Sequence, residues 1–167
     1  MLQRHWIEEK TGANCFMLYA RELSIAWADT PRHWSWSSVK ETSNVDVEVA
    51  NLVNVCWLEV DGKFDTSNLT PNTAYEVAFV VMIDDPAYGW NEPVTLKLVC
   101  PDGKVQERKE GLKQKPRGEW MEVHAGDFRT SMEKGGEIQF TLLNYNSDWK
   151  RGLVVKGAVI RPNKKSG

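Results

Sequence analysis

The sequence predicts an all-β protein, a jelly-roll-like antiparallel β-sandwich formed by a single domain. Short runs rich in β-branched and aromatic residues follow one another, and turn signals separate them at intervals of about ten residues. Apolar residues make up 41% of the 167 residues, which suits one ordinary hydrophobic core. We expect one domain over residues 1–167, with its core at about 16–162 and a flexible tail at 163–167.

The clearest strand is expected at 74–84. Its odd-numbered positions from 75 to 83 are all large and apolar, and 78, 80 and 82 are apolar as well. Both faces should therefore be covered, as in a central strand. Residues 45–52 fit a helix about as well as a strand. Further strands are expected at 16–20, 23–27, 54–61, 63–64, 94–99, 105–108, 119–124, 137–144 and 152–161.

Charge and composition exclude several classes of protein. The formal net charge of −2 gives no field that would favour nucleic acid or an anionic membrane. No apolar run reaches membrane-spanning length, and the first residues lack the apolar segment of a secretory signal. We therefore expect a cytoplasmic protein that is neither secreted nor bound to a membrane.

The three cysteines have no CxxC spacing, so neither a disulfide framework nor a zinc site is expected. Cys56 lies among apolar residues and is expected to be a small buried side chain. Cys15 and Cys100 lie near turn residues and are expected to be exposed thiols. A structural protein cross-linked through these two thiols is therefore one alternative.

Eight tryptophans are present, and their contexts differ. Trp57 and Trp120 lie among aliphatic residues and are expected in the core. Trp34 and Trp36 lie in a polar, proline-containing stretch at 29–38 that is expected to be a loop, which predicts exposed indoles and a binding role. The C–H face of a sugar ring packs well on such a surface.

A second polar and aromatic segment, 144–151, lies between the last two expected strands. In a jelly roll it can meet the first segment at one end. Trp34 would then be the floor of a sugar site, and Asn144 or Asn146 would contact an N-acetyl amide. Ordinary turn chemistry explains such a segment equally well.

Catalytic motifs are missing. The chain has no G-x-S-x-G, HExxH or phosphate-loop pattern, and its three histidines are scattered. Carboxylates such as Asp84, Asp85, Glu119 and Glu137 keep a glycosidase as a minor alternative. We expect no enzyme, no metal and no cofactor.

Residues 104–117 hold six basic side chains against two glutamates. Because aromatic residues are missing from this segment, a solvated loop is favoured over a contact with RNA. An RNA-binding carrier protein that uses this loop is the second alternative.

Four blocks of sequence resemble the phloem lectins (the phloem protein 2 family) and the related tobacco agglutinin-type lectins. The blocks follow one another in the order found in that family and extend from about residue 20 to residue 162. They are YARELSIAW at 19–27 with DTPRHWSW at 29–36, VANLVNVCWLEVDGK at 49–63, GEWMEV at 118–123, and WKRGLVVKGAVIRP at 149–162.

The resemblance implies a metal-independent lectin, usually a homodimer, that binds N-acetylglucosamine oligomers, N-glycan cores and glycoproteins. It also implies a location in the nucleocytoplasm or phloem sap of a plant. The sugar-binding tryptophans of the family fall on Trp27 and Trp34, its acidic residues on Glu137 and Asn144, and a lysine on Lys150. Asn144 is a departure, because related lectins carry glutamate there. Asn146 and Trp149 in the same loop complete the expected carbohydrate site.

Overall fold

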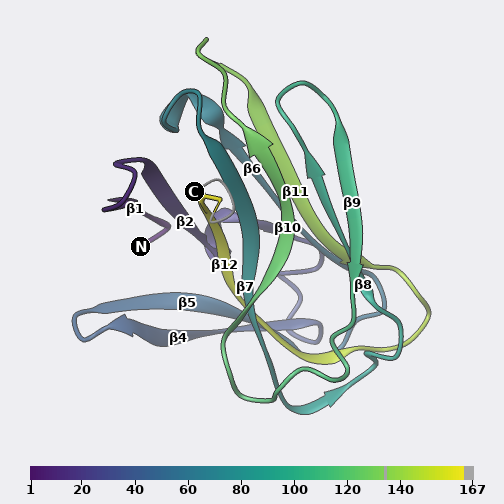
Figure 1. Ribbon diagram of the computed structural model, residues 1–167. Coiled ribbons are helices and arrows are strands. Elements are labelled where there is room, and N and C mark those ends of the chain that lie inside the picture. Colours follow the sequence, from purple (N-terminus) through teal and green to yellow (C-terminus); the bar gives the residue numbers. More distant parts are fainter. Residues whose placement is uncertain (134, 164–167) are drawn as a thin grey trace.

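The computed structural model describes residues 1–133 and 135–163, which form two antiparallel β-sheets packed face to face (Figure 1). The all-β, jelly-roll-like sandwich predicted from the sequence is confirmed. Two short 3-10 turns, Ala20–Glu22 and Thr66–Asn68, are the helical segments of the described chain. Within those residues, no helix is long and apolar enough to cross a membrane.

The larger sheet is organised around the last strand. Strand β12 pairs with β7 along its whole length on one side, and on the other side with β5 and then with β2. Strands β10, β4 and β1 extend the sheet from β7, β5 and β2. Its strands are β1 (Gln3–Ile7), β2 (Asn14–Tyr19), β4 (Trp34–Thr42), β5 (Val45–Leu52), β7 (Ala74–Tyr88), β10 (Met121–Arg129) and β12 (Arg151–Pro162).

The smaller sheet has the strand order β3-β6-β11-β8-β9. Its strands are β3 (Ser24–Ile25), β6 (Leu58–Asp65), β8 (Val94–Val99), β9 (Val105–Glu110) and β11 (Glu137–Asn144). The turn at 101–103 joins β8 to β9 as a hairpin. In β6 and β11 apolar side chains alternate inward with polar ones outward, so the outer face of this sheet is polar.

The core lies between the sheets. Phe79 of β7 meets Phe140 of β11 edge to face, with ring centroids 5.7 Å apart. Strand β7 is central, as the sequence predicts, because it lies between β10 and β12. Gly62 faces Phe140 across the β6–β11 pair, and a side chain at this position would clash with the phenyl ring.

One prediction about the chain's elements is wrong. Residues 34–38 belong to strand β4 instead of a loop, because β4 is an edge strand whose outward side chains are polar. Residues 45–52, for which helix and strand were both left open, are the strand that pairs with it. Residues 3–7, for which no element was predicted, form edge strand β1. Of the tail expected at 163–167, residues 164–167 lie outside the described part of the chain.

The predictions of which cysteines are buried and which are exposed are also wrong. Cys15 and Cys100 are buried, and burial raises the pKa of both thiols. Cys56 is partly exposed, with its thiol 3.5 Å from the carbonyl oxygen of Ser147. Thiols that are buried and protonated are poor partners for intermolecular bridging, so the cross-linked structural alternative loses its basis.

Candidate functional site at the loop end

Four loops gather at one end of the sandwich, which we call the loop end: 26–33, 53–57, 89–93 and 145–150. The loop at 145–150 is the yellow-green one at the lower right of Figure 1. Main-chain hydrogen bonds in both directions join Val55 to Lys150, at 3.2 and 2.9 Å. The His33 ring bonds the carbonyl oxygen of Asn54, and the Tyr88 hydroxyl donates to the Asn54 side chain. The loop end is therefore one connected surface.

Lys150 is the internal anchor of the loop end. Its side chain has no exposed surface, and its Nζ donates to the carbonyl oxygens of Cys56 (2.6 Å), Asp148 (2.9 Å) and Asn146 (3.3 Å). Burial lowers its pKa. Lys150 was expected to contact sugar; in this structure its ammonium group holds the 53–57 and 145–150 loops together and offers no exposed surface.

Asn144 has a similar internal role. It is buried, and its amide nitrogen donates to the carbonyl oxygens of Pro93 and Glu92 at 3.1 and 3.4 Å. Its side-chain oxygen accepts from the Asn146 backbone N–H at 2.9 Å. Asn144 therefore shapes the turn after β11 and offers little surface to a ligand. Asn146 is only partly buried, and its side-chain oxygen caps the Asp148 N–H.

Trp34 is the main correction to the predicted site. Only 2% of its surface is exposed, and its indole N–H donates to the carbonyl oxygen of Ala26 at 3.0 Å. It is the first residue of β4, where the alternation of the strand turns it into the core. Trp36 is partly buried, bonds the carbonyl oxygen of Ala28 and has the Arg21 guanidinium 3.6 Å from its ring centre. Neither indole is the open platform that was predicted.

The open aromatic rings are elsewhere in the same loops. Trp57 is 50% exposed and stacks on Tyr145, with centroids 3.7 Å apart and an interplanar angle of 15°. Trp149 is 54% exposed in the same loop as Tyr145. The prediction that Trp57 is a core residue is wrong, because it ends an irregular segment just before β6. Trp120, also expected in the core, is only partly buried, with the Lys156 ammonium 4.4 Å from its ring centre.

Trp27 is the predicted sugar-binding tryptophan that is exposed. Its backbone has φ of 69°, a left-handed conformation that is uncommon for a bulky side chain and marks the site as constrained. The Ala26 N–H donates to the carbonyl oxygen of Glu59. Trp27 therefore lies beside the start of β6, the strand that begins directly after Trp57. Its ring lies 5.7 Å from that of His33.

A hollow of about 450 Å³ adjoins the stacked pair. Polar side chains of Glu92, Thr95, Lys109 and Asn146 line it together with the Tyr145 ring. The Tyr145 hydroxyl donates to the Glu59 carboxylate, and burial together with this carboxylate raises the tyrosine pKa. The ring of Tyr145 is thereby fixed between Trp57 and Glu59.

Glu137 is not brought to the loop end. It begins β11, whereas Asn144 ends it, and the seven residue steps from one to the other span roughly 23 Å. Glu137 is exposed on the outer face of the smaller sheet and accepts a hydrogen bond from the Gln139 side chain at 3.2 Å. The structure thus brings Trp27, Asn144, Asn146, Trp149 and Lys150 together but leaves Glu137 outside this group.

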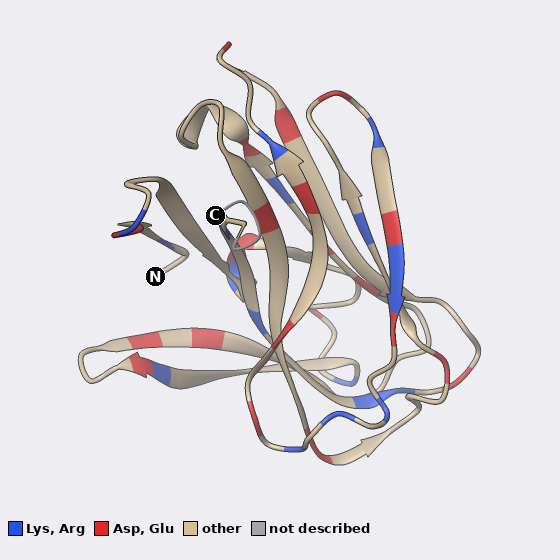
Figure 2. Cartoon of the chain, in the orientation of Figure 1, with Lys and Arg blue, Asp and Glu red and all other residues tan. Residues whose placement is uncertain are grey.

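The first part of the basic segment expected to be a loop, residues 105–110, is strand β9. Glu110 pairs with Lys115 at 2.8 Å and with Arg108 at 3.5 Å, and Arg117 lies 3.7 Å from Asp85. Figure 2 shows acidic and basic residues interspersed over both sheets. Much of the positive charge in this segment is therefore locally compensated, and no observation favours RNA over other ligands.

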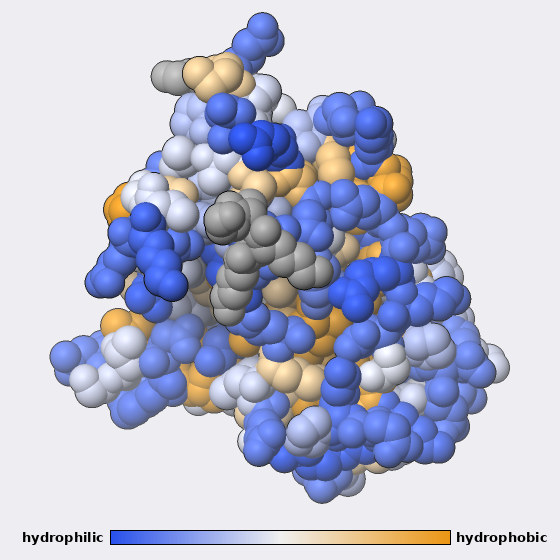
Figure 3. All heavy atoms as spheres, in the orientation of Figure 1, coloured by the Kyte–Doolittle hydropathy of each residue, from blue (hydrophilic) through white to orange (hydrophobic). Residues whose placement is uncertain are grey.

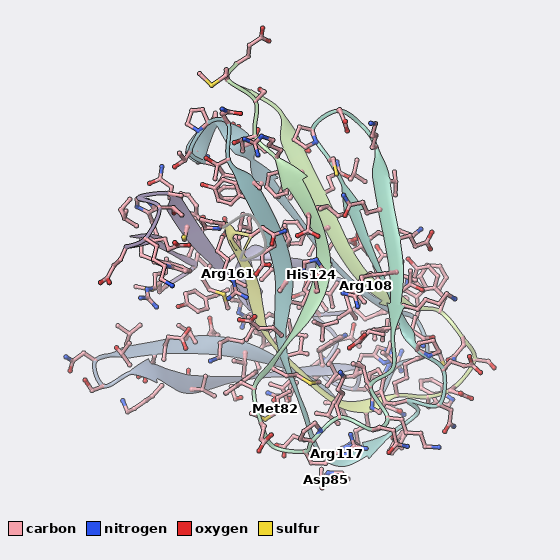
Figure 4. The ribbon with its side chains drawn as sticks, viewed as in Figure 1. Met82, Asp85, Arg108, Arg117, His124 and Arg161 are labelled. Carbon is pink, nitrogen blue, oxygen red and sulfur yellow. The ribbon has the colours of Figure 1, made fainter. Side chains whose placement is uncertain are left out.

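One histidine does lie with two carboxylates, on the larger sheet. Ligand atoms of Glu76, His124 and Asp127 lie within 4.8 Å of one another. Arg161 bonds Glu76 at 2.9 Å, and His124 bonds Asp127 at 3.0 Å, so a polar network already uses these groups (Figure 4). The network joins β7, β10 and β12. A metal ion would have to compete with the Arg161 guanidinium for the Glu76 carboxylate.

The chain is a β-sandwich that carries exposed aromatic residues on converging loops at one end. The family model described as Phloem protein 2 matches residues 13–162, and the chain belongs to that family. It is 48% identical over 162 residues to the protein PHLOEM PROTEIN 2-LIKE A1 of Arabidopsis thaliana, covering 95% of this chain and 65% of that protein.

Further similarities agree with this assignment. A protein of Luffa acutangula named lectin is 45% identical over 161 residues, covering 96% of this chain and 76% of that protein. The Podospora anserina GH26-CBM35 beta-(1,4)-mannanase matches 89% of this chain and 28% of its own, with a TM-score of 0.51 and 9% identity. The last similarity concerns the fold alone.

Proposed function

We propose that this chain is a carbohydrate-binding lectin that takes N-acetylglucosamine oligomers and N-glycan cores at its loop end. Membership of the phloem protein 2 family and the lectin of Luffa acutangula support the carbohydrate class. The observation that carries the proposal is the Trp57–Tyr145 stack, half open to solvent at the side of a polar hollow.

The stack suits a sugar ring for a geometric reason. Tyr145 covers part of the Trp57 indole, and half of the Trp57 surface stays exposed for the C–H face of a pyranose. Hydroxyl and acetamido groups then need polar partners at the edge of the ring. Asn146, Thr95 and Glu92 supply donors and acceptors in the adjoining hollow.

Trp149 and Trp27 are further exposed aromatic residues of the loop end. Both are exposed and lie on loops bound to the 53–59 segment. A shallow surface of this kind gives weak monovalent binding, and a homodimer with two such sites would compensate by avidity. The homodimer and the location in nucleocytoplasm or phloem sap stay predictions from the family resemblance.

The test is isothermal titration of chitotriose into the wild-type protein and two variants. Trp57→Ala should weaken binding about tenfold or more, because a central aromatic anchor is lost. Trp6→Ala is the matched control: it also removes a partly buried indole, but on β1 at the far edge of the larger sheet. Equal affinity of wild type and Trp57→Ala would contradict the proposed site, and a wild type without affinity for chitin oligomers and N-glycans would contradict the proposed function.

A further inference from the structure

The outer face of the smaller sheet carries a second hollow, next to the loop end. It has a volume of about 330 Å³ and lies over the middle of strands β3, β6 and β11. The outward side chains of these three strands form its floor, and Glu22 of the first 3-10 turn forms a wall. The lining residues are Glu22, Ser24, Asp61, Gly62, Lys63, Gln139 and Thr141.

The lining combines carboxylate, hydroxyl, amide and ammonium groups, which can serve as hydrogen-bond partners for a hydroxyl-rich ligand. Asp61 and Glu22 supply carboxylates, Ser24 and Thr141 hydroxyls, and Gln139 an amide. Two carboxylates stand against the one ammonium group of Lys63, so the lining itself disfavours an anionic ligand such as a phosphate. Neutral sugars fit this mixture of donors and acceptors.

Side-chain contacts connect this hollow to the loop end. Thr141 donates to Asp61 at 2.6 Å, and Asp61 and Glu59 share a hydrogen bond. Glu59 in turn accepts from Tyr145, which stacks on Trp57. The same polar chain therefore positions the floor of the hollow and the aromatic platform.

The register of β11 gives the length of the connection. Gln139 and Thr141 line the second hollow, and Leu143 and Tyr145 line the hollow at the loop end. All four positions have odd numbers, and those within the strand point outward. From 139 to 145 the strand and its continuation span about 20 Å, which leaves room for several linked sugar rings.

We propose that the hollow over Asp61 and Gln139 is a second sugar subsite, and that an N-acetylglucosamine chain runs from the Trp57–Tyr145 stack across Leu143 into it. The inference rests on the proposed function, because it extends the same ligand along the sheet. It assigns Gln139 and Asp61 to the contact with the distal rings. Glu137, which accepts from Gln139, then lies at the far end of the groove instead of beside Trp27.

Chain-length dependence tests the proposal, with chitotriose and chitohexaose titrated against the same set of variants. Wild type should bind chitohexaose about tenfold more tightly than chitotriose, because a few added hydrogen bonds are each worth several-fold in affinity. The double variant Asp61→Ala/Gln139→Ala should bind both oligomers as wild type binds chitotriose. The single variant Gln139→Ala, which changes an exposed side chain, should show part of this loss with an unaltered fold.

Glu107→Gln is the matched control, because Glu107 lies on edge strand β9 of the same sheet but lines neither hollow. It should keep the full chain-length preference. Equal affinities of wild type for the two oligomers, or a double variant that keeps the preference, would overturn the second subsite while leaving the site at Trp57 intact. A wild type that binds neither oligomer would overturn the proposed function itself.

Discussion

The interior and the surface of the loop end use the same residue type in opposite ways. Beneath the loops, Trp34 and Trp90 are buried, and their indole N–H groups donate to the carbonyl oxygens of Ala26 and Arg151 at 3.0 and 2.9 Å. On the surface, Trp57 and Trp149 leave about half of their area open to solvent. A tryptophan whose indole N–H donates to a carbonyl oxygen inside the protein can be buried at low cost. The exposed rings of Trp57 and Trp149 stay accessible to a ligand.

We call the buried side chains beneath the loops, such as Trp34 and Trp90, the supporting layer. The exposed rings of Trp57 and Trp149 form the proposed recognition layer. Lys150 and Asn144 belong to the supporting layer, because their polar atoms are used on main-chain carbonyls of neighbouring loops. Loops that carry a binding surface must be held in place if their aromatic rings are to be pre-organised. Substitutions in the two layers should therefore have different consequences, one on the free energy of unfolding and the other on affinity.

The largest effect is expected for Trp34→Ala. Removing a buried indole and its hydrogen bond should lower the free energy of unfolding by about 3–5 kcal/mol. Denaturant unfolding measures it, with Trp149→Ala as the control, which should change stability by less than about 0.5 kcal/mol. Similar losses for the two variants would remove the distinction between the layers.

Lys150→Met should lower stability by roughly 2 kcal/mol. The variant keeps the apolar stem but leaves three carbonyl oxygens without their donor, and part of this cost is offset because the charge is no longer desolvated. Hydrogen exchange should accelerate in 53–57 and 145–150 and stay unchanged in β1, where Lys150 makes no contact. Unchanged exchange in both loops would show that the ammonium group does not hold them.

A smaller effect is expected from Asp61→Asn, and it should depend on pH. Burial, together with the neighbouring Glu59, raises the pKa of Asp61 to about 6. Because the folded pKa is raised, the stability that this group contributes is fully present below its ordinary pKa of 3.8 and is lost as the pH rises through about 6. Glu22, Glu59, Lys63 and Lys97 are the other charged groups around it.

The variant Asp61→Asn keeps the hydrogen bonds of the neutral acid but cannot ionise. It should melt at a higher temperature than wild type at pH 7.5 and at nearly the same temperature at pH 4. Thermal unfolding across this range provides the measurement, and Asp29→Asn, at an exposed position in the 26–33 loop, is the control. A stability difference that is the same at both pH values would contradict the raised pKa.

Much of the fold follows from local sequence patterns. The alternation in 137–144 and the apolar run of 74–84 predict β11 and β7, because period-two patterns depend only on the chain itself. Strand β4 was mistaken for a loop because an edge strand with polar outward side chains has the composition of a loop. On the face shown in Figure 3, hydrophilic side chains cover most of the surface and apolar ones form separate patches, as an alternating pattern predicts.

The site could be predicted less well, because the burial of its residues is decided by contacts between loops. Trp34 is buried because Ala26, in the preceding loop, offers its carbonyl oxygen. Lys150 is buried because carbonyls of two separate loops converge on its ammonium group. A polar segment around a tryptophan indicates binding only when the ring is on the outside, and Trp57 shows that an apolar context does not guarantee burial.

The most direct test of the two-layer account is a chitotriose titration followed through the indole N–H signals of all eight tryptophans in a proton–nitrogen correlation spectrum. The Trp57 and Trp149 signals should shift with a common dissociation constant, while those of Trp34 and Trp90, hydrogen-bonded inside the core, should stay in place. Shifts of Trp34 larger than those of Trp57 would contradict the two-layer account.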